Sequence, residues 1–281
     1  MLISTQDFFQ TVVENKKNEV EKLKAIGMTM LGMLADAAPK PLDFLERLRC
    51  DGSIPIVAEI KRSAPSWTSY RKKLDIETVA KAYQYNGAAA ISVLTDSPFF
   101  GGSIDDLTAV RCQVTIPVLR KDFIVSVEQL YEARAAHADA VLLILAILDD
   151  DEISRLYKTA LDLRMTPLLE VHDAYEAQRA LKLNPRLIGI NNRNLKTLQV
   201  NLDVSERLRK IIPEDITVVA ESGVASVDDI QRLLSAGINA FLIGTALVKS
   251  ADPGKTLSSF VNVRMVALVN ISGAGLKPFA T

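Results

Sequence analysis

The sequence predicts a (β/α)8 barrel, the TIM-barrel architecture, preceded by a helical N-terminal extension. Two kinds of apolar run alternate along the chain, and a segment of helical character follows each run. Runs of the first kind end in charged residues; they are IPIVAEIK (54–61), IPVLRKDF (116–123), TPLLEVHD (166–173) and ITVVAESG (216–223). Runs of the second kind open with small residues and seldom carry charge; they are AAAISVLT (88–95), ADAVLLIL (138–145), RLIGINN (186–192) and INAFLIG (238–244). Eight strands that alternate with helices indicate parallel βα units.

Strand spacing and one missing motif favour a closed barrel over an open sheet. The prolines that open the first three charged runs, Pro55, Pro117 and Pro167, are separated by enough chain for two βα units each time. Such spacing suits odd and even strands that fill alternate layers of a barrel core. No GxGxxG follows the first strand, as an open dinucleotide-binding sheet would require.

The helical segments carry recognisable start and stop signals. Clear examples are 75–87, 126–136 and 226–237. In the last of them Ser226 is a suitable N-cap, and Gly237 is a suitable terminator. The apolar stripe between them consists of Ile230, Leu233 and Leu234, at helical spacing.

The two ends of the chain flank the predicted barrel. Residues 1–53 precede the first strand, and 5–26 read as a charged amphipathic helix. We expect this extension to pack on the barrel, so that residues 1–281 form one domain. Residues 261–281 follow the last predicted helix and have no assigned role.

Composition excludes several classes of function. The formal net charge of −1 provides no field that would gather nucleic acid or an anionic membrane. Two cysteines and two histidines, all isolated, cannot form a zinc site, and we expect no metal and no cofactor. The longest apolar run, 140–148, is too short to span a bilayer, and the N-terminus does not resemble a secretory signal. We therefore expect a cytoplasmic location.

Charged and polar residues at the strand ends predict an active site. Barrel enzymes build their sites at the carboxyl ends of the strands. A single pair such as Glu59 and Lys61 would be explained equally well as a structural ion pair. Many such residues from separate strands favour acid–base chemistry, because they push each other's pKa values apart. The residues at these ends are Glu59, Lys61, Lys121, Glu170, Asn191, Arg193, Glu221, Ser222, Gly244 and Thr245.

Two glycine-containing turns predict a phosphate site. ESGV (221–224) and LIGTAL (242–247) follow the seventh and eighth strands, and each runs toward a helix. In this fold the loops after those strands recurrently bind phosphate. Each turn is weak evidence alone, but both in this order favour a phosphorylated substrate.

Two other segments near the strand ends are ambiguous. His172 could serve as a second base beside Glu170, but a structural or rim position is the preferred interpretation. The FFGGS segment (99–103) predicts a glycine turn that borders the pocket, and a simple loop explains it equally well.

The ordered motifs resemble those of indole-3-glycerol-phosphate synthase over about residues 5–260. The matching segments are AEIKRSAPS (58–66), FFGGS (99–103), PVLRKDFI (117–124), LLEVHD (168–173), GINNRNL (189–195), VAESGV (219–224) and FLIGTALV (241–248). The resemblance implies a (β/α)8 fold with an N-terminal helical extension. It also implies conversion of 1-(2-carboxyphenylamino)-1-deoxyribulose 5-phosphate to indole-3-glycerol phosphate, carbon dioxide and water, without cofactor or metal, in tryptophan biosynthesis.

The resemblance also implies roles for the catalytic residues. Lys121 would be the general acid that activates the ribulose carbonyl, and Glu170 the acid or base of the later dehydration. Lys61 would hold the substrate carboxylate or donate a proton, and the division of labour between the two lysines stays open. Glu59 and Glu221 would orient these groups and stabilise positive charge on the anilino nitrogen.

Further residues would bind the substrate. Asn191, counted with the catalytic set, and Arg193 would position the sugar hydroxyls and the lysine–glutamate network. Phe123 would line the slot for the aromatic ring, near Leu142 and Leu195. The remaining substrate-binding residues implied are Ser66, and, for the phosphate, Ser222, Gly223, Gly244 and Thr245.

The loop after the first strand departs from the family pattern. Ala64 replaces a serine, and Trp67–Thr68 stand where a flexible pair is usual. A stiffer loop would affect rate more than identity. The alternatives are a barrel that binds a phosphorylated ligand but turns it over poorly, and a phosphosugar isomerase or Schiff-base aldolase with a nucleophilic lysine. The expected partner is a small phosphorylated molecule; a monomeric state and association with other tryptophan-pathway enzymes stay open.

Overall fold

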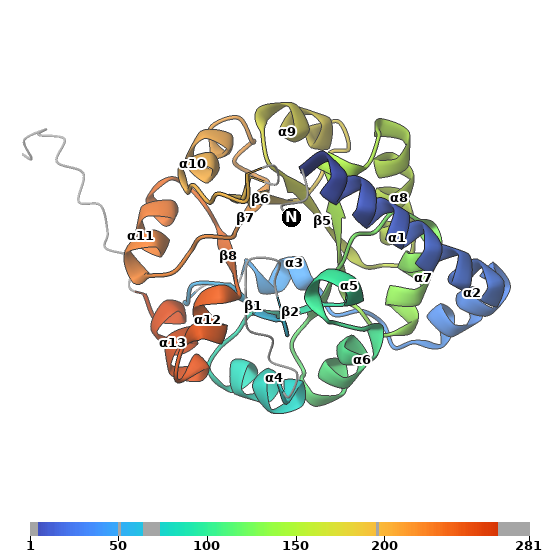
Figure 1. Ribbon diagram of the computed structural model, residues 1–281. Coiled ribbons are helices and arrows are strands. Elements are labelled where there is room, and N and C mark those ends of the chain that lie inside the picture. The colour runs from blue at the N-terminus through green and yellow to red at the C-terminus, as the bar shows by residue number, and fades with distance from the viewer. Residues whose placement is uncertain (1–4, 50–51, 64–73, 195–196, 264–281) are drawn as a thin grey trace, which may run out of the picture.

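Eight parallel strands close into a barrel in sequence order. The computed structural model describes residues 5–49, 52–63, 74–194 and 197–263 (Figure 1). All eight strands fall inside the runs expected from the sequence, and the (β/α)8 fold is confirmed. They are β1 (Ile56–Ile60), β2 (Ala90–Leu94), β3 (Val118–Lys121), β4 (Ala140–Ile144), β5 (Thr166–Val171), β6 (Leu187–Asn191), β7 (Thr217–Glu221) and β8 (Ala240–Ile243).

Helices form a ring outside the strands. The main ones are α4 (Ile76–Tyr85), α6 (Ile104–Gln113), α7 (Val127–Ala135), α8 (Asp150–Asp162), α9 (Ala174–Leu181), α10 (Asp203–Arg209), α11 (Val227–Ser235) and α13 (Pro253–Val261). Short turns are α5 (Ser97–Phe100), η1 (Leu145–Ile147) and α12 (Thr245–Lys249). The FFGGS segment therefore begins inside a helical turn, and the glycines follow that turn.

Helix α11 begins and ends as its sequence indicates. The Ser226 side chain accepts a hydrogen bond from the backbone N–H of Asp229, and the Asp229 carboxylate accepts one from the backbone N–H of Ser226. Such a reciprocal capping box satisfies donors that the first turn leaves unpaired. Ile230 and Leu233 are buried, and Gly237 follows the helix with a φ of 89°. The amphipathic stripe thus packs on the barrel as expected.

A helical extension precedes the barrel, as the sequence predicts, and in the described residues it consists of the predicted helix and two further ones. The three are α1 (Thr5–Ile26), α2 (Met28–Ala37) and α3 (Phe44–Arg47). Both α1 and α2 pack against α7 (Figure 1). Asp43 caps α3 by accepting a hydrogen bond from the N–H of Glu46.

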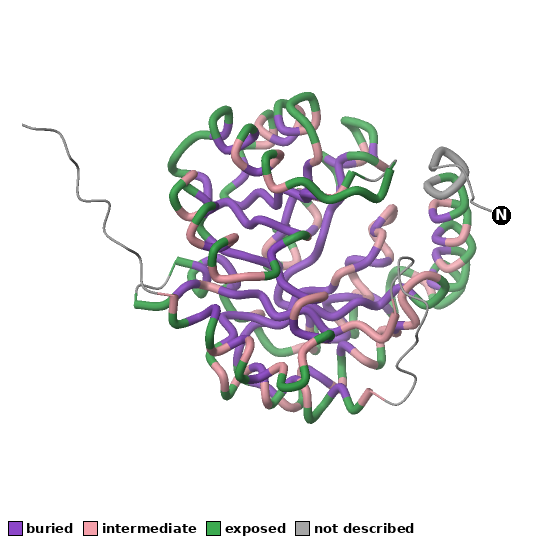
Figure 2. Tube along the Cα trace, turned by 60° about the vertical axis from the view of Figure 1, so that its left-hand side comes forward, coloured by how far each residue is buried: buried purple, intermediate pink, exposed green. Residues whose placement is uncertain are grey.

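The hydrophobic core has two concentric parts. The outer part lies between the strands and their helices. The inner part fills the barrel, where Phe44, Leu45 and Leu48 join inward-facing residues such as Val57 and Ala90. These strand residues lie near the amino ends of β1 and β2, so α3 closes the barrel floor. Figure 2 shows the buried residues gathered along the strands and exposed residues at the periphery.

No helix in the described part of the chain is both long enough and apolar enough to cross a bilayer.

We expect Phe44→Ala to lower the free energy of unfolding by about 3–5 kcal/mol, because it leaves a cavity in the barrel floor. Phe44 is fully buried, whereas the Leu42 side chain in the same segment is 39% exposed. Urea unfolding would measure the loss, with Leu42→Ala as the matched control. A loss no larger than that of the control would show that α3 is not part of the barrel core.

Candidate active site

One pocket at the carboxyl ends of the strands collects the residues expected from the sequence. Side chains two apart on a strand face the same way, so Glu59 and Lys61 both face the barrel interior from β1. Ser66 lies outside the described residues. All the other expected residues line this pocket: Glu59, Lys61, Lys121, Phe123, Glu170, Asn191, Arg193, Glu221, Ser222, Gly223, Gly244 and Thr245.

Lys121, at the end of β3, lies between two carboxylates. Its Nζ is 2.8 Å from Oε2 of Glu221 and 3.4 Å from Oε2 of Glu170. Burial lowers the pKa of Lys121, but Glu221 and Glu170 outweigh that effect and raise the pKa overall. The side chain is therefore a charged N–H donor that points into the pocket.

The two carboxylates beside Lys121 differ in their partners. Glu170 also contacts Nδ2 of Asn191 at 3.1 Å and Nε2 of His172 at 3.1 Å. Burial raises the pKa of Glu170, but Lys121 and His172 outweigh it, and the pKa falls below its usual range. For Glu221, burial raises the pKa, and the attraction of Lys121 does not cancel burial and the repulsion from Glu170. Glu170 is thus the ionised member, and Glu221 protonates more easily.

Lys61 forms a second ion pair on the opposite wall. Its Nζ is 2.6 Å from Oε1 of Glu59 and donates a hydrogen bond to Oγ1 of Thr245 at 3.1 Å. Burial raises the pKa of Glu59, but Lys61 and Lys121 outweigh it and hold the pKa below its usual range. This pair connects β1 to the turn after β8, and both residues face the pocket.

His172 lies between two carboxylates just past β5. Its Nδ1 is 3.0 Å from Oε2 of Glu176, and its Nε2 faces Glu170. Burial lowers the pKa of His172, but hydrogen bonds to Glu170 and Glu176 outweigh it and raise the pKa to about 10. A ring flanked by two carboxylates favours the protonated imidazolium, which is a donor and not a base, and this supports the rim interpretation. His172 supports Glu170 from the rim.

Asn191 and Arg193 extend from β6 into the pocket. The Asn191 amide donates to Glu170 and accepts, through Oδ1, the backbone N–H of Arg193 at 3.0 Å. The Arg193 guanidinium donates to the carbonyl of Leu198 at 3.0 Å. Asn191 therefore orients Glu170, and the turn around Arg193 is pinned to the strand end.

The two expected phosphate turns are built differently. Gly244 is the N-cap residue of α12, which begins at Thr245 directly after β8. The turn after β7 does not lead straight into a helix, because α11 begins only at Val227. Ser222 and Gly223 instead take positive φ angles of 61° and 90°. Both turns therefore lead toward a helix, directly at 242–247 and, at 221–224, through two successive left-handed residues and a short link to Ser226.

An aromatic wall faces the pocket from the ends of β2 and β3. The Phe123 ring lies 6.5 Å from that of Phe99 and 6.3 Å from that of Phe100, between ring centroids. Phe123, Phe100 and Leu142 line the pocket, and Leu195 lies outside the described residues. The FFGGS segment does border the site, through Phe100.

Several residues that line the pocket were not expected. They are Leu94, Asp96, Phe100, Asp122, Ile144, Leu198, Val224, Leu242 and Ile243. Of the apolar members, Leu94, Ile144 and Leu242 come from strand ends and could have been found from the strand alternation. Asp122 could not, because it belongs to the face of β3 that points away from the barrel axis. In the described ranges no group of three or more His, Cys, Asp or Glu residues could hold a metal ion.

Comparisons with known proteins point to one family. The family model for indole-3-glycerol phosphate synthase matches residues 9–260. Curated proteins named indole-3-glycerol phosphate synthase include one from Albidiferax ferrireducens, 45% identical, with 90% of this chain and 97% of the relative covered. One from Nocardioides sp. is 50% identical over 78% of this chain and 84% of the relative.

A solved structure of thiamine phosphate pyrophosphorylase from Pyrococcus furiosus is similar in fold. Its TM-score is 0.55 at 18% identity, with 74% of this chain and 93% of that one covered. At this identity the likeness concerns the barrel alone. The family match and the curated relatives are decisive: the chain belongs to the indole-3-glycerol phosphate synthase family.

Proposed function

We propose how the pocket residues divide the work of this carboxy-lyase, which closes the indole ring of indole-3-glycerol phosphate in tryptophan biosynthesis. One observation carries the proposal: a charged lysine between two buried carboxylates faces an aromatic wall on one side and the glycine turns on the other. Such an arrangement can orient an aryl amine and a phosphorylated sugar toward each other.

In the first step the aromatic ring attacks the ribulose carbonyl carbon. Lys121 donates a hydrogen bond and then a proton to the carbonyl oxygen, because its ammonium is the charged donor in the centre of the pocket. Lys61, on the opposite wall, holds the substrate carboxylate until carbon dioxide leaves. The carbon–carbon bond forms as the ring loses its aromaticity, and loss of carbon dioxide restores it.

In the second step the new hydroxyl leaves as water. Glu170 takes part as acid or base, and His172, Asn191 and Lys121 hold its carboxylate in place. Glu59 and Glu221 face the positive charge that develops on the anilino nitrogen. Glu221 can also exchange a proton near neutrality, since its pKa is raised.

The substrate ends are held at opposite sides. Phe123 and its neighbours receive the aromatic ring. Ser222, Gly223, Gly244 and Thr245 receive the phosphate, with Arg193 near the sugar hydroxyls. Gly244 has no room for a side chain, because a Cβ there would overlap the carboxylate of Glu59. Ser66 stays a predicted substrate contact.

Neither alternative is favoured by these observations. A Schiff-base aldolase needs a neutral lysine, whereas both carboxylates hold Lys121 in its charged form. A binding barrel without turnover would not need its lysines and glutamates paired across strands. Treatment with borohydride and substrate separates the cases, since only the aldolase would trap a covalent adduct.

We further infer a protein that acts in the cytoplasm on a small phosphorylated substrate. The proposed residues other than Ser66 line one pocket of the chain, and a monomeric state stays a prediction. The helices before β1 contribute to the barrel core, and we treat them and the barrel as one domain. Association with other tryptophan-pathway enzymes stays a prediction.

We expect Lys121→Ala to lower kcat by about 10²–10⁴-fold, the range for loss of one general acid. Inhibition by inorganic phosphate should change little, because the proposed phosphate turns lie after β7 and β8. Indole-product fluorescence measures turnover, and Lys158→Ala, at an exposed position on α8, is the matched control. Near-normal turnover by Lys121→Ala would remove the acid assignment.

We expect the charge on His172 to stabilise the fold below neutral pH and through mild alkali. Its pKa is raised from about 6.5 to about 10, so its contribution is complete below pH 6.5 and is lost as the pH rises through 10. The difference in unfolding free energy between the native protein and His172→Gln should therefore shrink over that interval. With only two histidines in the chain, an NMR titration can assign the His172 signal by its absence from the variant. A midpoint near 6.5 would contradict the paired geometry.

A further inference from the structure

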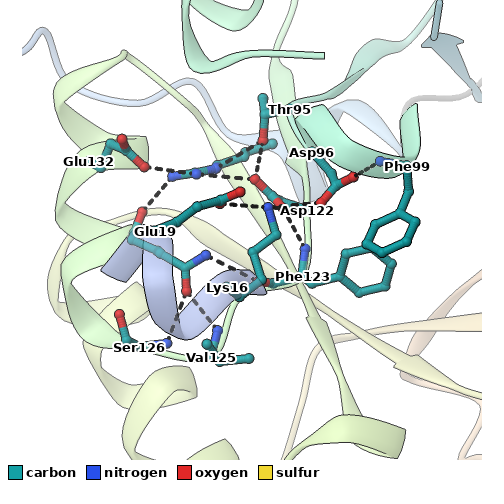
Figure 3. Close-up of polar contacts among 12 residues, drawn as sticks. Lys16, Glu19, Thr95, Asp96, Phe99, Asp122, Phe123, Val125, Ser126 and Glu132 are labelled. Atoms are coloured by element: carbon teal, nitrogen blue, oxygen red, sulfur yellow. Dashed lines mark hydrogen bonds and ion pairs between the residues drawn. The ribbon is translucent and has the colours of Figure 1, made fainter. Parts of the chain in front are cut away.

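Helix α1 inserts a fully buried lysine under the rim of the active site. The Nζ of Lys16 is 2.9 Å from Oδ2 of Asp96, 2.8 Å from Oδ1 of Asp122 and 2.8 Å from Oε2 of Glu19 (Figure 3). Lysine is almost never fully buried unless it is paired. Asp96 and Asp122 stand just past the ends of β2 and β3, and both line the pocket. A residue far away in sequence thus joins two strand ends.

Asp122 has further buried partners besides Lys16, on the side of β3 that faces the helices. Arg120, also buried, places Nη2 3.2 Å from Oδ2 of Asp122 and 2.8 Å from Oε2 of Glu132. The hydroxyl of Thr95 donates to the same Oδ2. Burial raises the pKa of Asp122, but Arg120 and Lys16 outweigh it and hold the pKa low. Without Lys16, a buried carboxylate would lose one of its two cations.

The same two carboxylates also hold the backbone of the aromatic wall. Asp122 Oδ1 accepts the N–H of Phe123 at 2.8 Å, and Asp96 Oδ1 accepts the N–H of Phe99 at 2.8 Å. Figure 3 shows Lys16 between the two aspartates, with both phenylalanines beyond them. The two rings meet edge to face at the pocket wall. Lys16 therefore lies one contact away from the backbone that aims these rings.

We propose that Lys16 is a positioning residue for the aromatic half of the substrate. Lys16 pairs with Asp96 and Asp122 together and so fixes the distance between the ends of β2 and β3. This distance in turn sets the orientation of the Phe99 and Phe123 rings. Lys16 also fixes the rotation of the strand end that carries Lys121, which directly precedes Asp122. This inference rests on the proposed function, since it assigns the aromatic ring to this wall.

The test compares Lys16→Met with Lys24→Met. Lys24 is exposed on the same helix and pairs only locally with Glu21, so its removal controls for loss of a helix charge. Below the unfolding temperature of each variant, Lys16→Met should lose about 10–100-fold in kcat/KM, the cost of a small misplacement of reacting groups. Most of the loss should be in KM, and inhibition by inorganic phosphate should be unchanged.

A purely structural role predicts a different result. Lys16→Met would then unfold at lower temperature but keep its KM and kcat, and that result would overturn the proposal. Activity of the native protein keeps the two inferences apart: an inactive native protein refutes the proposed function, whereas an active one with an unaffected variant refutes only the role of Lys16.

One further variant keeps the test decisive if Lys16→Met does not fold, and a double-mutant cycle extends the test if it does. Lys16→Gln retains N–H donors for the aspartates, and a raised KM supports the proposal while an unchanged KM overturns it. In an Asp96→Asn background, Lys16→Met should cost less in KM than it does in the native protein, because one of the charges it neutralises is gone. Strict additivity of the two effects would show that Lys16 does not act through Asp96.

Discussion

The contact of Lys121 with Glu170 and Glu221 is the interaction on which the rest of the site depends. A closed parallel barrel directs alternate side chains inward, so charged residues at several strand ends must share one confined space. Three inward glutamates, Glu59, Glu170 and Glu221, would be costly there without cations. Lys61 and Lys121 supply them, and Glu221, whose Oε1 has no hydrogen-bond partner among the described residues, is the one that takes up a proton most easily.

Glycines create the room that these carboxylates occupy. A Cβ on Gly189, in β6, would overlap Oε1 of Glu221, and one on Gly244 would overlap Oε1 of Glu59. Gly189 lies inside a strand, where glycine usually weakens packing. Here its missing side chain lets a neighbouring strand turn a carboxylate toward the barrel axis. The glycines in GINN and LIGT are therefore part of the acid–base site as well as of the backbone.

The sequence was most informative for the strands, because the two-residue alternation of a strand determines which side chains face inward. Every strand lies inside an apolar run, and the inward charges of β1, β3, β5 and β7 could be paired with the pocket because strand alternation is strict. The start of α11 was predicted correctly from Ser226, whereas the positive φ angles of Ser222 and Gly223 in the turn before it could not be read from the sequence. His172 was left ambiguous because its fate depends on Glu176, which contacts it from the start of α9.

Lys16 was beyond prediction for a different reason. A lysine in a charged amphipathic helix reads as a solvated residue, and its burial depends on how α1 crosses the strand ends. The same limit applies to Arg120 and Asp122, to which the sequence analysis of the run IPVLRKDF assigned no role. Alternation instead sends Lys121 inward and sends its two neighbours toward the helices.

Strand β3 thus carries two ionic clusters, one on each face of the strand. On the inner side Lys121 meets carboxylates that are open to the substrate, so their protonation can change during a reaction. On the outer side Arg120 and Lys16 both contact the buried carboxylate of Asp122, whose pKa they hold low, so this carboxylate keeps its charge. The ammonium group of Lys121 needs a rigid support, because the carboxylates beside it exchange protons during the reaction while the ammonium group must keep its position. The buried ionic cluster around Asp122 provides that support, and Lys16 of α1 supplies one of the positive charges that the cluster needs.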